Sequence, residues 1–174
     1  MLDKFVPDMY LKSVYDIDYN KLKKKGIKCV IFDLDNTLAP LNMNKPSKKL
    51  KDLIEDIKEL NLKILIISNS NKKRVEPFKE ILNVDSAYFA GKPFSKKYKK
   101  VMNLYRLKTT QIACVGDQLL TDIYGANRLE LLSILVNPIG NTDYVLTKFN
   151  RFIEPFIYNK LEKKELLKKG EYYE

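Results

Sequence analysis

Four short segments carry side chains that can handle a phosphate group together with a hard metal ion. Asp33 and Asp35 stand two residues apart in DLDNT, Ser68 stands in SNS, Lys92 stands in GKP, and the fourth segment is GDQLLTD. Carboxylates bind hard divalent cations and can also attack phosphorus, whereas a hydroxyl or an ammonium can hold phosphoryl oxygens. Together, the four segments indicate a site for phosphate chemistry with a divalent cation.

The two aspartates of DLDNT suit complementary roles. Two carboxylates at one strand end repel each other unless a cation joins them or one of them holds a proton. Asp33 can act as a nucleophile towards phosphorus, which gives an aspartyl-phosphate. Asp35 can protonate the leaving oxygen and then deprotonate the water that cleaves the intermediate. For an isolated DxD pair, the alternative is a capping or turn role.

The second and third segments offer phosphate contacts. Ser68 and Asn69 follow the apolar run ILII, where a hydroxyl and backbone amides can cradle a phosphate, although capping of the next helix is the alternative. Lys92 stands between a glycine, which permits close approach of the backbone, and a proline, which fixes the exit direction. A lysine placed there can hold a phosphate and offset an acidic cluster, although lysines are common in this chain.

The fourth segment supplies two more carboxylates. Asp117 and Asp122 flank a turn after QIACVG, where Asp117 can bind a metal ion and Asp122 can orient it. Helix capping is again the alternative for Asp117. Since the capping alternatives would have to hold independently at successive strand ends, the sequence favours a phosphate-and-magnesium site.

Strands and helices must alternate to position these residues. The runs CVIF, ILII and QIACV precede three of the segments, which places their polar residues at the carboxyl ends of buried parallel strands. This alternation predicts an α/β fold, a doubly wound parallel sheet of about five strands. The expected strands cover residues 28–32, 63–67, 86–90, 111–115 and 132–136. The expected helices cover residues 19–25, 46–60, 72–82 and 95–107, and a last one opens in the GDQLLTD turn and runs through residue 129.

We expect residues 1–174 to form a single domain. Residues 1–27 make a lead segment whose apolar residues are loosely spaced as in a helix, residues 28–137 make the catalytic core, and residues 138–174 make a helical segment with a lysine-rich end. Residues 39–48 are too few to hold a cap domain, and so is the stretch between the second and third segments. We therefore expect an open site.

Composition narrows the chemistry and the partners. The chain has no histidine, which excludes histidine-ligated metals and phosphohistidine chemistry. The net charge of +10 favours anionic partners, with a solvated lysine-rich surface as the alternative. Basic and aromatic residues do not interleave as in a single-strand binding groove, so no specific nucleic acid is expected. Cys29 and Cys114 fall in strand runs and are expected as buried, reduced thiols in a cytoplasmic protein.

With these motifs the chain resembles the haloacid dehalogenase (HAD) superfamily of phosphohydrolases. The resemblance covers residues 28–137 and implies Asp33 as nucleophile and Asp35 as acid and base. It also implies that Ser68 and Lys92 hold the phosphoryl group, and Asn69 is expected to bind phosphate with them. Lys92 is therefore also counted among the catalytic residues.

The same resemblance implies a Mg²⁺ ion bound by Asp33, Asp117 and the main-chain oxygen of Asp35. Thr37 and Asp122 are the expected supporting residues. The family's strand order would bring Asp117 beside Asp33, because the strand that carries the nucleophile is central.

The combination of DLDNTL, SNS, GKP and GDQLLTDIYGANR resembles the capless YqeG-type branch of the superfamily's subclass III. Some members of this branch are phosphatidylglycerophosphate phosphatases. The resemblance implies a Mg²⁺-dependent phosphomonoesterase with a lipid-linked substrate. Phosphatases for nucleic-acid ends, phosphoproteins or soluble metabolites, and a non-catalytic binding module, are the alternatives.

Peripheral contact with an anionic membrane, at its inner face, is a further expectation. The positive charge would attract the protein to such a surface, and apolar residues of the lead segment, such as Phe5 and Met9, would dock on it. The alternative is that these apolar residues cover the sheet. The sequence leaves the oligomeric state open.

Overall fold

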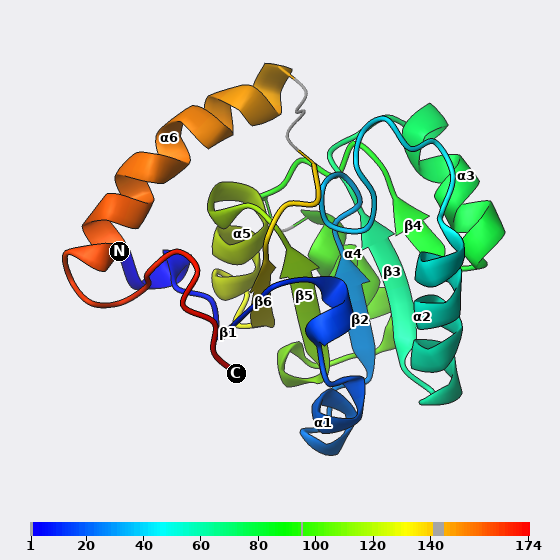
Figure 1. Ribbon diagram of the computed structural model, residues 1–174. Coiled ribbons are helices and arrows are strands. Elements are labelled where there is room, and N and C mark those ends of the chain that lie inside the picture. Colours follow the sequence, from blue (N-terminus) through cyan, green and yellow to red (C-terminus); the bar gives the residue numbers. More distant parts are fainter. Residues whose placement is uncertain (1, 95, 141–144) are drawn as a thin grey trace.

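The chain folds around a six-stranded parallel sheet (Figure 1). The computed structural model describes residues 2–94, 96–140 and 145–174, with side chains in the last range from residue 150 onward. The order of the strands is β1-β6-β5-β2-β3-β4. Their bounds are β1 (Met9–Leu11), β2 (Cys29–Phe32), β3 (Lys63–Ile67), β4 (Asp85–Ala87), β5 (Ile112–Gly116) and β6 (Leu132–Val136).

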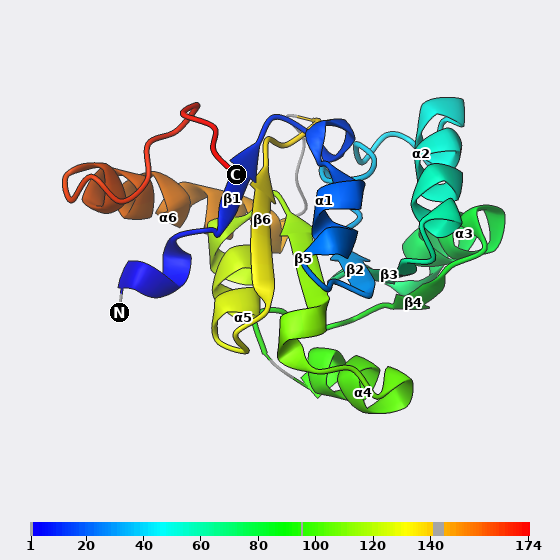
Figure 2. The ribbon, with the colours of Figure 1, turned by 90° about the horizontal axis from the view of Figure 1, so that it is seen from below.

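Helices cover both faces of the sheet, so the fold has three layers (Figure 2). One face carries α1 (Tyr19–Lys24), α2 (Lys48–Glu59) and α3 (Lys72–Leu82). The other face carries α4 (Lys96–Tyr105) and α5 (Tyr124–Asn127), which a π-helical turn (Leu119–Ile123) precedes. Helix α6 (Val145–Glu162) extends beyond the β1 edge of the sheet (Figures 1 and 2). The α/β class and the doubly wound parallel sheet are confirmed.

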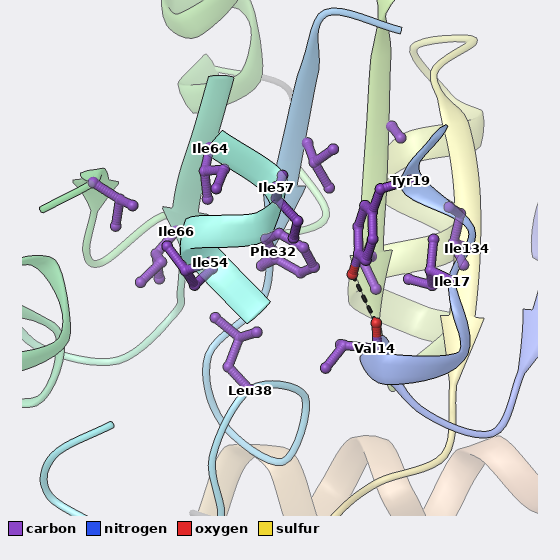
Figure 3. Packing of buried hydrophobic residues seen from close by; sticks show 14 of the residues in the cluster. Val14, Ile17, Tyr19, Phe32, Leu38, Ile54, Ile57, Ile64, Ile66 and Ile134 are labelled. Atoms are coloured by element: carbon purple, nitrogen blue, oxygen red, sulfur yellow. Dashed lines mark hydrogen bonds between the residues drawn. The ribbon is translucent and has the colours of Figure 1, made fainter. Parts of the chain in front are cut away.

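Alternation along the strands divides the core between the two faces. Val30 and Phe32 of β2 belong to the cluster beneath α1, α2 and α3, whereas Cys29 and Ile31 belong to the cluster beneath α4 and α5. Successive side chains of a strand point to opposite faces, so a central strand needs apolar residues at every position. Figure 3 shows Ile54 of α2 near Phe32 and Ile66 of the sheet.

The lead segment departs from its expected helical form. Met9–Leu11 is a sixth strand that pairs in parallel with β6, and a 3₁₀ turn, Leu2–Phe5, precedes it. Met9 is buried in the core, and the ring of Phe5 stacks on Tyr124 at 4.8 Å. The burial of Met9 contradicts the docking role expected of that residue, and Phe5 packs partly against the fold, as the alternative reading of the lead segment expects. A short apolar run does not by itself distinguish a strand from a helix.

Most helix boundaries follow local signals. The Asp18 carboxylate accepts a hydrogen bond from the Lys21 amide and caps α1, and Ser47 caps α2 in the same way. The helix expected from the GDQLLTD turn to residue 129 is shorter and divided, because a π-helical turn precedes α5. Residue 95 and residues 141–144 of the expected helical segments lie outside the described residues.

Residues 34–46 and 69–91, all of them described, hold no inserted domain. The first stretch is a loop with a single isolated bridge, and the second contains only α3 and β4. Among the helices that the structure describes, none has the length and apolar character needed to cross a membrane. Because no domain is inserted in these two stretches, the carboxyl edge of the sheet is bordered by loops, α6 and the first turn of α4.

Candidate active site

The predicted polar residues gather at the carboxyl edge of the sheet. Strand β2 lies between β5 and β3, so Asp33, Asp117 and Ser68 follow three adjacent strands (Figure 1). The amide of Asp33 still donates to the carbonyl of Val115 at 2.9 Å, which continues the sheet pairing to the edge. All three polar side chains are buried. The strand order thus brings the first, second and fourth sequence segments together.

Lys92 lies at the centre of this group. Its Nζ is 2.5 Å from Oδ1 of Asp33 and 2.5 Å from Oδ1 of Asp122. The side chain of Asn69 holds the Lys92 backbone at both polar groups: its Oδ1 accepts from the Lys92 amide at 2.8 Å, and its Nδ2 donates to the Lys92 carbonyl at 3.3 Å. The structure therefore gives Asn69 the task of positioning Lys92, whereas a phosphate contact of Asn69 stays a prediction.

Three carboxylates form a cluster with the geometry of a cation site. Asp33, Asp117 and Asp122 each offer one oxygen, and these oxygens lie within 4.8 Å of one another. Oxygen-only donors of this kind suit a hard divalent cation. Asp122, predicted as a supporting residue, is part of the cluster, whereas the side chain of Asp35 lies in a separate network.

Burial and mutual repulsion disfavour the ionised forms of Asp33 and Asp117. Burial raises the pKa of Asp33 well above its ordinary value, Lys92 lowers it, and the neighbouring carboxylates of Asp122 and Asp117 raise it further. The pKa of Asp117 is raised to about 7, chiefly by burial, although Arg151 lowers it. Burial lowers the pKa of Lys92, but Asp122 and Asp33 outweigh that effect and raise it well above its ordinary value. Lys92 is therefore cationic, and the cluster favours a bound positive charge.

Asp35 lies in a separate network with an arginine that the sequence reasoning missed. Nε of Arg74 donates to Oδ1 of Asp35 at 2.8 Å, and the hydroxyl of Ser70 donates to Oδ2. The Arg74 guanidinium also donates to the carbonyl oxygens of Pro40 and Met43, in the loop between β2 and α2. Arg74 thus fixes both Asp35 and the loop. Its place in the first turn of the helix after SNS was the available signal.

The capping alternative considered for Ser68 and Asn69 is not what the structure shows. Asn71, rather than Ser68 or Asn69, caps α3 by accepting a hydrogen bond from the Arg74 amide. The Ser68 hydroxyl accepts from the Ser70 amide at 3.0 Å and lies 3.5 Å from Oδ2 of Asp35. These polar groups therefore face the carboxyl edge of the sheet.

A second missed residue, Arg151, reaches the site from α6. Its guanidinium donates to Oδ2 of Asp117, to the Asp117 carbonyl at 3.2 Å, and to Glu154 at 3.2 Å. Glu154 in turn accepts from the Leu119 amide at 2.7 Å, which ties α6 to the π-helical turn. On its other side, Asp117 accepts from the hydroxyl of Thr37 at 2.9 Å, and the supporting role of Thr37 stays a prediction. No local signal marks Arg151, since it stands 34 residues after Asp117.

Gly116 leaves the space that Asp122 occupies. A Cβ atom at residue 116 would lie 2.3 Å from Cγ of Asp122 and 2.4 Å from its Oδ2. Asp122 also accepts from the Gln118 amide at 3.2 Å, so its side chain is held from two sides. Glycine at the end of β5 therefore allows the fourth segment, GDQLLTD, to bring Asp122 back onto the site.

The variant Gly116→Ala tests this packing. The added methyl must displace Asp122 from Lys92, so we expect a loss of about 1–3 kcal/mol in the free energy of unfolding, as for other overpacked sites. Chemical denaturation measures the loss. The matched control is Gly125→Ala in α5, where the nearest atom would lie 3.4 Å away and alanine favours the helix. Equal stability of the two variants would contradict the role given to Gly116.

Comparison with known proteins identifies the family of this chain. Residues 2–139 match the family described as "Mitochondrial PGP phosphatase". The "Probable phosphatase YqeG" of Bacillus subtilis is 38% identical over 165 residues, which cover 94% of this chain and 96% of that protein. The "Phosphatidylglycerophosphate phosphatase 1, chloroplastic/mitochondrial" of Arabidopsis thaliana is 25% identical over 170 residues, 92% of this chain and 46% of that protein.

Solved structures share the fold at lower identity. A predicted HAD-like family hydrolase from Porphyromonas gingivalis superposes with a TM-score of 0.54 at 11% identity, covering 72% of this chain and 98% of that one. The 3-deoxy-D-manno-octulosonate 8-phosphate phosphatase of Yersinia pestis superposes with a TM-score of 0.54 at 15% identity, covering 87% and 91%. From the family match and the Bacillus relative, the chain belongs to the mitochondrial PGP phosphatase family and is a phosphatase of the haloacid dehalogenase type.

Proposed function

We propose that this phosphatase is a Mg²⁺-dependent phosphomonoesterase that works through an aspartyl-phosphate and removes the terminal phosphate of phosphatidylglycerophosphate. The observation that carries the proposal is the contact of Lys92 with Asp33 beside a cluster of three buried carboxylates. This arrangement joins a nucleophile, a phosphate-binding cation and a divalent-cation site within a few ångströms.

The residues divide the reaction between them. Asp33 attacks phosphorus through a carboxylate oxygen while Lys92 holds phosphoryl oxygens. Asp35, which Arg74 and Ser70 orient, gives a proton to the leaving oxygen and then takes one from the water that cleaves the aspartyl-phosphate. A Mg²⁺ ion bound by Asp33, Asp117 and Asp122, with the Asp35 main-chain oxygen as the family resemblance implies, would neutralise charge on the transferring group.

Two observations support a lipid-linked substrate. The chain matches a family described as PGP phosphatase along residues 2–139, and the distant Arabidopsis relative carries the same activity in its name. The loops around the site contain no inserted cap, so a phosphate that projects from a large assembly can reach the edge of the sheet. Phosphate on a lipid headgroup fits this access.

A phosphate-release panel tests the substrate. The purified protein with Mg²⁺ is given phosphatidylglycerophosphate in mixed micelles, a phosphopeptide, a 5′-phosphorylated oligonucleotide and glycerol 3-phosphate. We expect kcat/KM to be highest for the lipid by at least about tenfold, a difference of about 1.4 kcal/mol in transition-state binding. A higher value for any of the other three compounds would replace the lipid proposal with that substrate class.

The variant Asp33→Asn tests the covalent route. The amide keeps the shape of the side chain but cannot attack phosphorus, so hydrolysis should fall by about three orders of magnitude or more while the fold persists. Phosphate release and circular dichroism measure the two effects. The matched control is the exposed carboxylate variant Asp52→Asn on α2, which should keep full activity. Normal turnover by folded Asp33→Asn would rule out the aspartyl-phosphate.

The pKa of Asp117 sets the pH dependence of cation binding. A carboxylate with a pKa of about 7 holds a proton below that pH, and a cation must displace it. We expect Mg²⁺ affinity, measured by isothermal titration calorimetry, to fall by up to about tenfold per pH unit below pH 7, with proton release on binding. Affinity that does not change between pH 5.5 and pH 8, or full activity after chelation, would contradict the proposed site.

A further inference from the structure

Two exposed phenylalanines stand close in the chain to residues that contact the carboxylates of the candidate active site. Phe94 is 68% exposed and stands two residues after Lys92, and Phe152 is 69% exposed and directly follows Arg151. Lys92 and Arg151 both contact carboxylates of the site. Because consecutive Cα atoms lie about 3.8 Å apart, these two contacts hold both phenylalanines close to the site.

Helix α6 turns one side towards the protein and the other towards solvent. Ile157, Tyr158 and Leu161 pack in the cluster that includes Tyr10 of β1. Phe152 and Phe156 lie on the opposite side, one helical turn apart, with ring centroids separated by 5.8 Å in an edge-to-face pair. Both rings are mainly exposed, so α6 presents an aromatic pair to solvent on the side that faces away from the core.

Positive charge lies next to Phe94. Residues 86–116 contain seven basic residues and no acidic residue; the basic ones are Lys92, Lys96, Lys97, Lys99, Lys100, Arg106 and Lys108. Four of the seven belong to residues 96–100, the first five residues of α4, which begins four residues after Lys92. Three of these four lysines are exposed, at residues 96, 99 and 100. Phe94 and the three exposed lysines are thus close together in the chain, and they combine an aromatic side chain with positive charge.

We propose that Phe94, Phe152 and Phe156 insert into the surface of an anionic lipid bilayer, with the lysines at the start of α4 on the headgroups. This deepens the proposed function and rests on it, because a docked enzyme would meet a lipid phosphate without removing the lipid from the bilayer. Transfer of a phenylalanine ring from water into the bilayer interface lowers the free energy, and so does the attraction of a lysine to the negative potential of such a surface.

Charge favours a bilayer over a second copy of the chain as the occupant. A second copy would bring the same net charge of +10 and the same lysines to the interface, so the two surfaces would repel each other. An anionic bilayer complements the charge and also accepts aromatic side chains from two separate elements without matching their shape. The lead segment does not compete for this role, because Met9 is buried and Phe5 stacks on Tyr124.

Vesicle binding tests the proposal directly. The full chain is sedimented with phosphatidylglycerol vesicles and with phosphatidylcholine vesicles at low salt. We expect the parent protein to bind the anionic vesicles only, and the double variant Phe152→Ser/Phe156→Ser and the variant Phe94→Ser each to weaken binding by about tenfold. Hydrolysis of a soluble aryl phosphate should stay within about twofold of the parent, which shows that the variants are folded.

The matched control is Leu104→Ser on α4. Leu104 is 67% exposed, but it lies eight residues after Lys96, about 12 Å further along the helix from the edge of the site. This variant should bind anionic vesicles as the parent does. An equal loss in Leu104→Ser would show that exposed apolar area in general, rather than the rim of the site, drives binding.

Three results would overturn the docking surface: a parent that ignores anionic vesicles, phenylalanine variants that bind as the parent does, or variants that change only the oligomeric mass measured by light scattering. The last result would assign the rim to a second copy of the chain. The vesicles carry no phosphomonoester, so this test is independent of turnover. Vesicle binding combined with hydrolysis of soluble phosphates alone would refute the lipid substrate and leave the docking surface in place.

Discussion

The site depends on positive charge placed among buried carboxylates. Asp33, Asp117 and Asp122 converge at one edge of the sheet, where burial and mutual repulsion raise the pKa values of Asp33 and Asp117. Lys92 contacts two of the three carboxylates at 2.5 Å, and Arg151 contacts the third. Since a buried charge is tolerated only when it is paired and hydrogen-bonded, these contacts make the cluster compatible with a folded protein. The same carboxylates suit the divalent cation that we propose, and the Lys92 ammonium suits the proposed phosphate group.

Each cationic group is itself held by a separate part of the structure. Asn69 fixes the Lys92 backbone, and α6 brings Arg151 to Asp117 through the contact of Glu154 with the Leu119 amide. Arg74 serves Asp35 in a similar way and also binds the carbonyl oxygens of the loop after β2. The network therefore links β2, β3, β5 and α6. Removal of one positive group would leave a buried carboxylate unbalanced, so we infer that these contacts stabilise the fold as well as the site.

The surroundings of the site distinguish this chain from an enzyme whose active site is enclosed by an inserted domain. Short loops, the first turn of α4 and helix α6 border the edge of the sheet. Exposed phenylalanines and lysines on these elements give the rim an apolar and positive character. The open access to the site and the chemistry of its surroundings thus agree with a substrate phosphate that belongs to a large anionic assembly. The proposed lipid substrate, embedded in a bilayer, is of this kind.

The sequence by itself determined the α/β class, the order of the four polar segments and most helix limits. These features depend on apolar strand runs, helix caps and glycine turns, whose effect on the backbone is limited to residues nearby in the chain. Strand β3 and helix α3 have the bounds that the sequence predicted. Only the tertiary structure decided that Met9–Leu11 is a sixth strand, that Asp122 joins the carboxylate cluster, and that Arg74 and Arg151 bind the aspartates. These features depend on contacts between residues far apart in the chain, and neither local propensity nor side-chain periodicity contains that information.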